Sequence, residues 1–481
     1  MRSLTPDDAG SIGGVPGPIE RELLDLGFAA KLMCSGLYVS ERSEAALLER
    51  VVAPHTSAGT PIEFQVNQEL RRVSAATASG LVRHALYCGD QGAVLLPVGA
   101  SKVFFEPRPI SSSLPPAALQ DWPLGDRSAL ADAQTLRALG YDLAQLKRSE
   151  ATVMAPPPAG YTSAWLVCHR GRLISECYAP QVQAQTQLQS WSMGKTLVAS
   201  LVGRFVQRGE LDLDQRALLP QWCHGSDPRQ EIRLRDLLQM SSGLDFTAPW
   251  KEDYEPAQGF PDHSYMYSGS VDVEQLALSR SLNHEPGTFG AYQNADTLAL
   301  LAICKRLGAV HGLHPLELPQ RLLLDAIGIR HCTLETDCYG NQVLTGYNFG
   351  TARDWVRVGL LWLHRGRWQG SELMPEAFVD FACAPAPAWR GKYWMAQAPE
   401  GFDDSIYGAQ LFRNHHAPED RWPLPEDACF MLGIAGQVTF FVPSLELVIV
   451  RFADYRALEH NTGREPLQQA IAELLPALPA S

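Results

Sequence analysis

The sequence of 481 residues has no long apolar run, no CxxC pair and no excess of basic residues. Its most apolar stretch, 298–304, meets Lys305 and Arg306 well short of the roughly 18 residues that span a bilayer. The ten cysteines are scattered from Cys34 to Cys429, without the spacing of a zinc ribbon or a dense disulfide framework. Forty basic against 53 acidic residues give a formal net charge of −13, the wrong sign for a nucleic-acid binder. We therefore expect no membrane span and no nucleic-acid binding.

Two signatures of common enzyme classes are also absent or incomplete. No GxSxG string occurs, which excludes the nucleophile elbow of the α/β-hydrolases. Gly194-Lys195-Thr196 matches the end of a phosphate-binding P-loop, but the position that needs the first glycine of that motif holds Gln189. The sequence therefore predicts neither of these two sites.

The residues that are present are typical of a large globular protein, with 46% hydrophobic and 19% charged side chains. Residues 1–125 differ from the rest, because short strand-like runs at 36–39, 93–98 and 102–105 alternate with polar, turn-forming stretches. A stretch rich in proline and serine ends this part. We expect an N-terminal accessory domain over 1–125 and a second domain over 126–481.

The second domain combines strands at both of its ends with helices between them. Apolar runs predict β-hairpins over 164–178 and 437–452, and helical spacing predicts a buried helix over 192–206 and a terminal helix over 466–475. The part between, 211–396, is mostly helical. The pattern favours an α/β (α+β) fold in which one antiparallel sheet, made from both chain ends, is flanked by helices and interrupted by a helical lobe.

The segment Ser192-Met-Gly-Lys195 is the strongest candidate for chemistry. At the start of a helix, a spacing of three residues places the lysine ammonium on the same face as the serine hydroxyl. A desolvated lysine can take the proton of a serine and so activate it as a nucleophile. The helix N-terminus also favours negative charge that develops there. Taken alone, however, a serine at a helix start is more often only a cap.

Further motifs follow along the chain, and together they favour a catalytic role for Ser192 over that of a helix cap. Tyr292 and Asn294 come from a loop ahead of a patterned helix, and Gly433-Ile-Ala-Gly-Gln437 reads as the start of a strand. Three more segments belong to the same pattern: 191–196, 234–244 and 352–360. Together they resemble the serine β-lactamase and penicillin-recognising superfamily, in its class C, esterase and 6-aminohexanoate-oligomer hydrolase branch. The resemblance runs from about residue 126 to the C-terminus and implies a β-lactamase/transpeptidase-like fold.

The resemblance also implies a role for each motif residue. Ser192 would be the acyl-enzyme nucleophile, Lys195 its partner in proton transfer, and Tyr292 the group that shuttles the proton; which of Lys195 and Tyr292 is the general base stays open. Asn294 would hold Lys195 and a substrate carbonyl. The oxyanion would lie between the backbone N–H groups of Ser192 and Gln437. Gly436 would let the substrate approach the strand edge.

One position departs from the β-lactamase pattern. The third motif of β-lactamases carries a cation, and Ile434 stands there in this chain. A substrate carboxylate would lack its partner, unless Arg413, His415 or His416 supplied one from a loop. The expected substrate is therefore a small amide or ester, neutral or differently charged from a penicillin. β-Lactamase activity, or a D-amino-acid peptidase if the protein is exported, is the alternative within the superfamily.

No cofactor or metal is expected. The histidines at 311, 314, 415 and 416 lack further ligands at zinc spacing. Residues 1–18 lack the apolar core of a signal peptide, although the family resemblance leaves periplasmic export open. An alternative from another class is a catalytically silent binding protein on the same fold. The intact Ser192, Lys195 and Tyr292 argue against it. The oligomeric state is not predicted.

Overall fold

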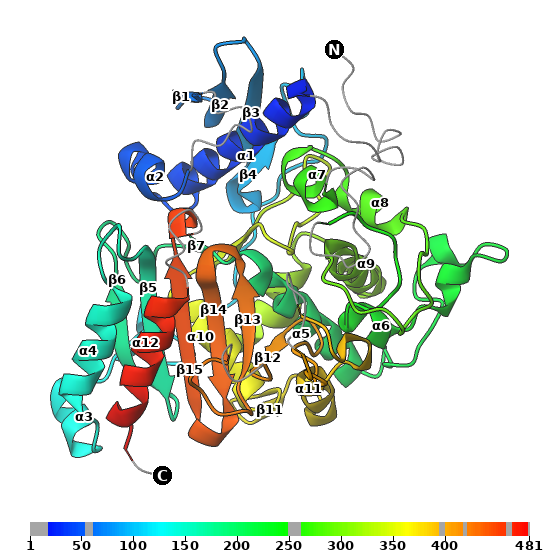
Figure 1. Cartoon of the computed structure of the whole chain (residues 1–481). Helices are drawn as coiled ribbons and strands as arrows, with labels where there is room; N and C mark the ends of the chain where they lie inside the picture. Colours follow the sequence, from blue (N-terminus) through cyan, green and yellow to red (C-terminus); the bar gives the residue numbers. More distant parts are fainter. Residues whose placement is uncertain are drawn as a thin grey trace.

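A six-stranded antiparallel sheet lies at the centre of the molecule (Figure 1). The computed structural model describes residues 18–52, 61–248, 261–393, 400–416, 421–457 and 464–479. The strand order of the sheet is β12-β13-β14-β15-β5-β6. Its strands are β5 (Thr162–His169), β6 (Arg172–Tyr178), β12 (Phe412–Arg413), β13 (Cys429–Gly433), β14 (Gln437–Val442) and β15 (Leu447–Ala453).

The two chain ends meet in the middle of this sheet. β15 pairs antiparallel with β5, and Ile449 lies opposite Val167. The two predicted hairpins are confirmed as the pairs β5–β6 and β14–β15. Every residue of β5 and of β15 is buried. Both faces of these strands must therefore be covered by other elements.

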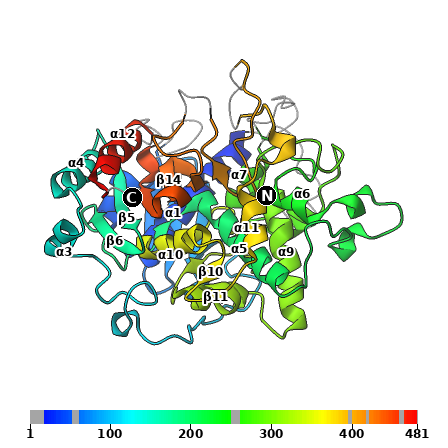
Figure 2. The same ribbon diagram turned by 90° about the horizontal axis from the view of Figure 1, so that it is seen from below.

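Helices cover both faces, as Figure 2 shows. On one face lie α4 (Leu143–Val153) and α12 (Glu465–Leu474), preceded by the short α3 (Ala133–Ala138). On the other face lie α10 (Ala352–Leu363) and α5 (Gly194–Gln207). Gly359 lets α10 approach β15 closely, because a Cβ there would lie 2.6 Å from a methyl group of Val448. Trp355 and Trp362 are buried in this contact layer.

The helical lobe lies beside the sheet, mostly in green at the right of Figure 1, with α11 in dark yellow below it. Its helices are α6 (Leu234–Leu238), α7 (Asp262–Ser268), α8 (Val273–Leu278), α9 (Asn294–Val310) and α11 (Glu376–Cys383). A small sheet in the order β7 (Leu188–Gln189), β9 (Asn348–Gly350), β8 (Thr333–Leu334) joins it to the segment that leads into α5. A separate two-stranded sheet contains β10 (Arg367–Trp368) and β11 (Ser371–Glu372).

The N-terminal part begins with two helices, α1 (Pro18–Tyr38) and α2 (Glu44–Arg50). A four-stranded antiparallel sheet follows, with β1 (Glu63–Asn67), β2 (Arg72–Ala76), β3 (Val82–Tyr87) and β4 (Ala93–Leu95).

Two of the strand-like runs predicted in this part are wrong. Residues 36–38 continue α1, and residues 102–105 form no strand. The third run, 93–98, contains β4. The helix continues through its β-prone end because Gly36 packs against Leu47 of α2, so tertiary packing overrides local propensity.

The N-terminal part shares one continuous hydrophobic core with the part of the chain that forms the six-stranded sheet and the helical lobe. Lys31 on α1 forms a buried ion pair with Glu335, which also accepts hydrogen bonds from Ser35 and from the backbone N–H of Ala93. Arg42 donates to Asp454 at the end of β15, at 2.8 Å. These contacts fix α1 against the rest of the molecule.

Candidate active site

Ser192 lies in a tight turn, Trp191–Met193, that leads directly into α5. The turn puts Trp191 in the left-handed region, at φ +51°, a conformation that costs a bulky residue free energy. Asn348 on β9 holds the turn by donating to the Trp191 carbonyl at 2.8 Å. Gly194 follows at a close approach, because a Cβ there would overlap the Asn348 side chain and the Leu344 carbonyl. The nucleophile candidate is therefore held by backbone contacts on both sides.

Lys195 is buried one helical turn below Ser192, with 1% of its surface exposed. Its Nζ donates to Ser192 Oγ at 3.0 Å and to the carbonyl of Thr345 at 3.1 Å. Burial lowers the pKa of Lys195 well below its usual range. A neutral amine at this distance can accept the serine proton.

Tyr292 completes a group of three side chains. Its hydroxyl is hydrogen-bonded to Ser192, and Lys195 Nζ lies 4.8 Å from the centroid of its ring. Burial raises the pKa of Tyr292, so the phenol keeps its proton at neutral pH. The environment thus favours Lys195 over Tyr292 as the group that takes the first proton.

Asn294 lies near this group but has a different partner from the one predicted. Its side chain donates to the Tyr267 hydroxyl at 3.1 Å instead of holding Lys195. Tyr267 in turn donates to the Thr345 carbonyl at 3.0 Å, the same oxygen that accepts from Lys195. Asn294 therefore connects to the lysine through Tyr267 and Thr345.

Sequence reasoning missed both Tyr267 and Thr345. Thr345 contributes only a backbone carbonyl, which any residue type supplies. Tyr267 lies on the short helix α7, and burial raises its pKa to about 12, so it acts here as a phenol donor. His263, on the same helix, has a pKa lowered to about 4, chiefly by burial.

The glycine-rich third motif forms the turn that leads into a strand, and the predicted strand begins at Gln437. β13 ends at Gly433, residues 434–436 form one tight turn with Ala435 at φ +65° and Gly436 at φ +80°, and β14 begins at Gln437. A Cβ at Gly433 would overlap the carbonyl oxygen of Ser190. Gly433 is therefore the motif residue packed directly against the nucleophile loop.

Gln437 has a structural contact that was not predicted. Its side chain donates to the Ala453 carbonyl at 2.7 Å and accepts from the Ala453 N–H at 2.8 Å, and 1% of the residue is exposed. These bonds tie the start of β14 to the end of β15.

Ile434, in the turn before Gln437, is exposed over 41% of its surface, whereas Gln437 is buried.

The cations considered as substitutes for the missing one at Ile434 are engaged elsewhere. Arg413 lies opposite Cys429, at the end of β13 that is remote from Gly433. Its guanidinium donates to the Ser405 carbonyl at 2.6 Å and to Asp404 at 3.2 Å. His415 Nδ1 contacts the same Asp404, at 2.6 Å. The ring of His416 packs against Tyr393 and Phe430. These side chains hold a loop together instead of facing Ser192.

The remaining histidines make separate contacts. His311 contacts Glu210 at 2.7 Å, and His314 accepts from the backbone N–H of Leu316. Among the residues that the structure describes, no group of three or more His, Cys, Asp or Glu side chains could hold a metal ion. In the same described ranges, no helix combines the length and the apolar character needed to cross a bilayer.

The antiparallel sheet, the helical lobe and the half-buried Ser192 beside the buried Lys195 are the features of a β-lactamase-like protein. A family model described as Beta-lactamase matches residues 158–472, and the chain belongs to this family. A search of curated protein sequences returns no match.

Three solved structures illustrate the similarity of fold. A protein from Bacillus anthracis assigned as a 6-aminohexanoate-dimer hydrolase is 19% identical, with a TM-score of 0.50 over 65% of this chain and 78% of that one. A protein from Bacteroides dorei assigned as a β-lactamase is 20% identical, with a TM-score of 0.54 over 70% and 99%. EstCE1, a hydrolase with promiscuous acyltransferase activity, is 18% identical, with a TM-score of 0.53 over 69% and 99%. At these identities the similarity establishes the fold, which is shared with hydrolases.

Proposed function

We propose that the protein is a serine hydrolase that cleaves a small amide or ester through an acyl-enzyme on Ser192. One observation carries this proposal: the Nζ of the buried Lys195 lies 3.0 Å from Ser192 Oγ. A lysine inside a protein is costly unless it is paired or neutral. A desolvated amine beside a hydroxyl at a helix start is the arrangement that activates a serine.

The proposed reaction has two halves. Ser192 Oγ attacks the substrate carbonyl carbon while its proton passes to Lys195 Nζ. The carbonyl oxygen becomes an oxyanion, stabilised by the N–H of Ser192 and by N–H groups of the 433–437 turn. Tyr292, bonded to Ser192, relays the proton to the departing amine or alcohol. Water then attacks the acyl-enzyme along the same proton path, releases the acid and restores Ser192.

The proposed substrate is uncharged near the scissile bond. Ile434 is exposed at the position where a β-lactamase carries a cation, and Arg413 and His415 are bonded to Asp404. A carboxylate at this place would be desolvated without a partner, which is unfavourable. Two solved structures with this fold are named as a 6-aminohexanoate-dimer hydrolase and as a hydrolase with promiscuous acyltransferase activity, which agrees with a hydrolase that acts on a small ester or amide.

Covalent labelling tests the proposal. A fluorophosphonate probe should label the wild-type protein once, and p-nitrophenyl butyrate should be hydrolysed. Ser192→Ala should abolish both, while Ser279→Ala, at the end of α8, should leave both unchanged. A folded Ser192→Ala protein that still hydrolyses the ester would contradict the proposal. A wild-type protein that is neither labelled nor active would instead support a silent binding protein.

A further inference from the structure

Helix α1 of the N-terminal part reaches the residue next to the nucleophile. The ring centroid of Phe28 lies 5.9 Å from that of Trp191 and 5.5 Å from that of Tyr455, and Trp191 and Tyr455 are 5.8 Å apart. Trp191 directly precedes Ser192. Three aromatic rings from remote parts of the chain therefore form one cluster beside the proposed nucleophile. Rings at these separations pack favourably with each other.

The position of Phe28 in this cluster is fixed by its own helix. Gly27 allows α1 to pack closely on α7, because a Cβ there would lie 2.8 Å from the Ser268 carbonyl. Arg83 bridges the same two helices by donating to the Leu23 and Ser268 carbonyls, both at 3.1 Å. Further along α1, Lys31 is paired with Glu335. Phe28 is thus held by buried polar contacts on both sides of it.

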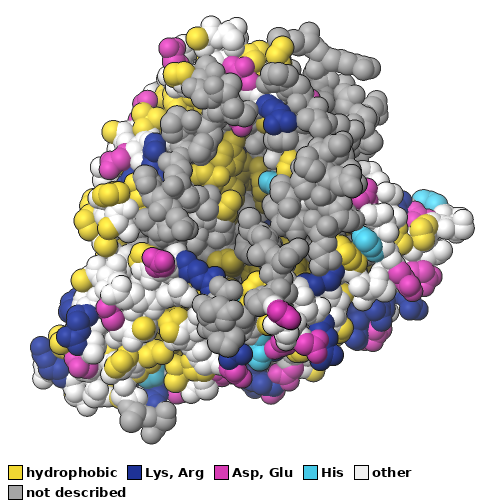
Figure 3. Space-filling view, in the orientation of Figure 1, with side chains coloured by type: hydrophobic (Ala, Val, Ile, Leu, Met, Phe, Trp, Pro, Cys, Tyr) yellow, Lys and Arg dark blue, Asp and Glu magenta, His cyan; other side chains and the backbone are white. Residues whose placement is uncertain are grey.

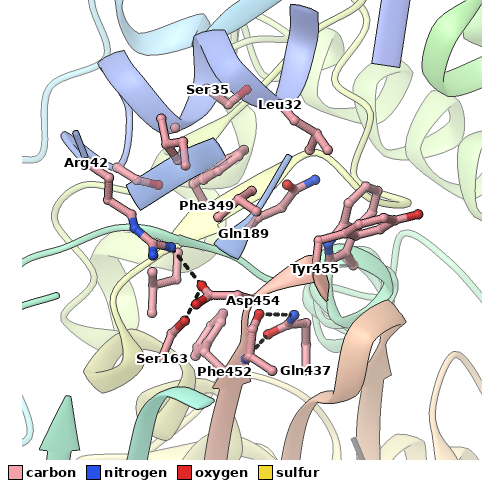
Figure 4. A pocket seen from close by; sticks show the side chains of 17 residues that line it. Leu32, Ser35, Arg42, Ser163, Gln189, Phe349, Gln437, Phe452, Asp454 and Tyr455 are labelled. Carbon is pink, nitrogen blue, oxygen red and sulfur yellow. Dashed lines mark hydrogen bonds and ion pairs between the residues drawn. The ribbon is translucent and has the colours of Figure 1, made fainter. Parts of the chain in front are cut away.

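Tyr455 is fixed in a similar way from the other side. Figure 4 shows Arg42, which follows α1, pointing at Asp454, the residue before Tyr455. Asp454 also accepts a hydrogen bond from Ser163, and Arg50 of α2 pairs with its second oxygen. Removal of these partners would leave a buried carboxylate unpaired, so the structure resists a shift of this segment.

The cluster is partly exposed at the surface next to Ser192. Phe28 and Tyr455 are half-buried, and the turn that carries the exposed Ile434 packs against the turn 455–457. None of these side chains is charged. On the face drawn in Figure 3 the molecule is hollowed between α1 and the β13–β14 hairpin, and hydrophobic side chains line the hollow.

We propose that Phe28 determines acyl-chain specificity: with Trp191 and Tyr455 it forms an apolar wall against which the acyl group on Ser192 packs. The acyl group is the part of the substrate bound to Ser192 Oγ, so its chain extends over the neighbours of that residue. The N-terminal part then completes the substrate site instead of serving as a separate module. This inference rests on the proposed hydrolase function.

The test compares kcat/KM for p-nitrophenyl hexanoate and p-nitrophenyl acetate, which share a leaving group. In Phe28→Ala the hexanoate-to-acetate ratio should fall about tenfold, because an apolar contact of one to two methylene groups is worth roughly that factor. Phe28→Leu should keep most of the wild-type ratio. Phe64→Ala, which removes a half-buried ring from β1 in the same part of the chain, is the matched control and should leave the ratio unchanged.

Each outcome has a separate meaning. An unchanged ratio in a folded, active Phe28→Ala protein would overturn the inference and leave the hydrolase proposal intact. An equal loss with both esters would also overturn it, since the role of the ring would then be structural. If Phe28→Ala fails to fold, Phe28→Leu and Phe28→Trp test the inference instead. Phe28→Leu should keep most of the wild-type hexanoate-to-acetate ratio, whereas the larger ring in Phe28→Trp should change it. An unchanged ratio in Phe28→Trp would overturn the inference. If the fluorophosphonate probe failed to label Ser192 in the wild-type protein, the hydrolase proposal itself would be refuted.

Discussion

At the scale of single residues, the burial of Lys195 costs stability, as expected if this lysine serves as the proposed base. An unfolded lysine is protonated up to its ordinary pKa of 10.5, whereas burial lowers the pKa in the folded protein. Between the two pKa values the unfolded chain binds the extra proton, so acid favours unfolding there. Functional groups of this kind often reduce stability.

We therefore expect Lys195→Met to raise the melting temperature while lowering kcat roughly a hundredfold to ten-thousandfold, the usual contribution of a general base. The gain in melting temperature over wild type should widen as the pH falls below 10.5, towards the lowered pKa of the lysine. Thermal melts of wild type and Lys195→Met, recorded from alkaline to neutral pH, measure this difference in melting temperature. A gain that is independent of pH would mean that Lys195 is protonated in the fold.

Ile434 offers a second prediction at this scale. Wild-type protein should hydrolyse p-nitrophenyl acetate readily and nitrocefin slowly or not at all, because the aliphatic side chain of the exposed Ile434 cannot pair with a carboxylate. Ile434→Lys should raise nitrocefin turnover relative to the ester by about tenfold or more, the value of a hydrogen bond to a charged group. Ile434→Met controls for the added length. Wild-type nitrocefin efficiency well above ester efficiency would contradict this interpretation.

At the scale of secondary-structure elements, the end of β13 must approach the nucleophile loop without a side chain. In Gly433→Ala the new methyl group would overlap the Ser190 carbonyl and push the strand away from Ser192. A displacement of about 1 Å can cost roughly a hundredfold in rate, so kcat should fall by that order. Gly350→Ala on β9 is the control, because the nearest atom to its Cβ would be 3.4 Å away. Equal rates for the two variants would argue against a role for this approach.

The elements with a clear local period were predictable, and those that depend on distant partners were not. The hairpins over 164–178 and 437–452 consist of short apolar runs joined by turn residues, a local pattern that favours strands. The end of α1 reads as a strand because its β-prone residues are helical only through packing on α2. At the site, Ser192 and Lys195 are one helical turn apart and visible in the sequence. The link from Asn294 through Tyr267 depends on the fold, which brings segments from three parts of the chain together.

At the scale of the whole molecule, a buried ion pair joins the N-terminal part to the rest. Lys31→Met leaves Glu335 as an uncompensated buried charge and should destabilise the protein by about 3–5 kcal/mol. The double variant with Glu335→Gln should recover much of this loss. Lys147→Met removes an exposed pair with Glu150 and should cost about 0–1 kcal/mol.

Urea unfolding followed by tryptophan fluorescence and by circular dichroism should give one coincident transition, because both parts share one core. Two separate transitions would contradict that coupling.

The pairing of β15 with β5 determines when, during synthesis, the protein can acquire activity. β5 can pair with β15 only after about 280 further residues have been synthesised, and contacts over such a separation form slowly. Ser192 is synthesised about 240 residues before Gly433, and β15 follows later still. During that interval a nascent chain carries the proposed nucleophile without the strand that faces it. The proposed catalytic centre can therefore form only after β13, β14 and β15 have been made.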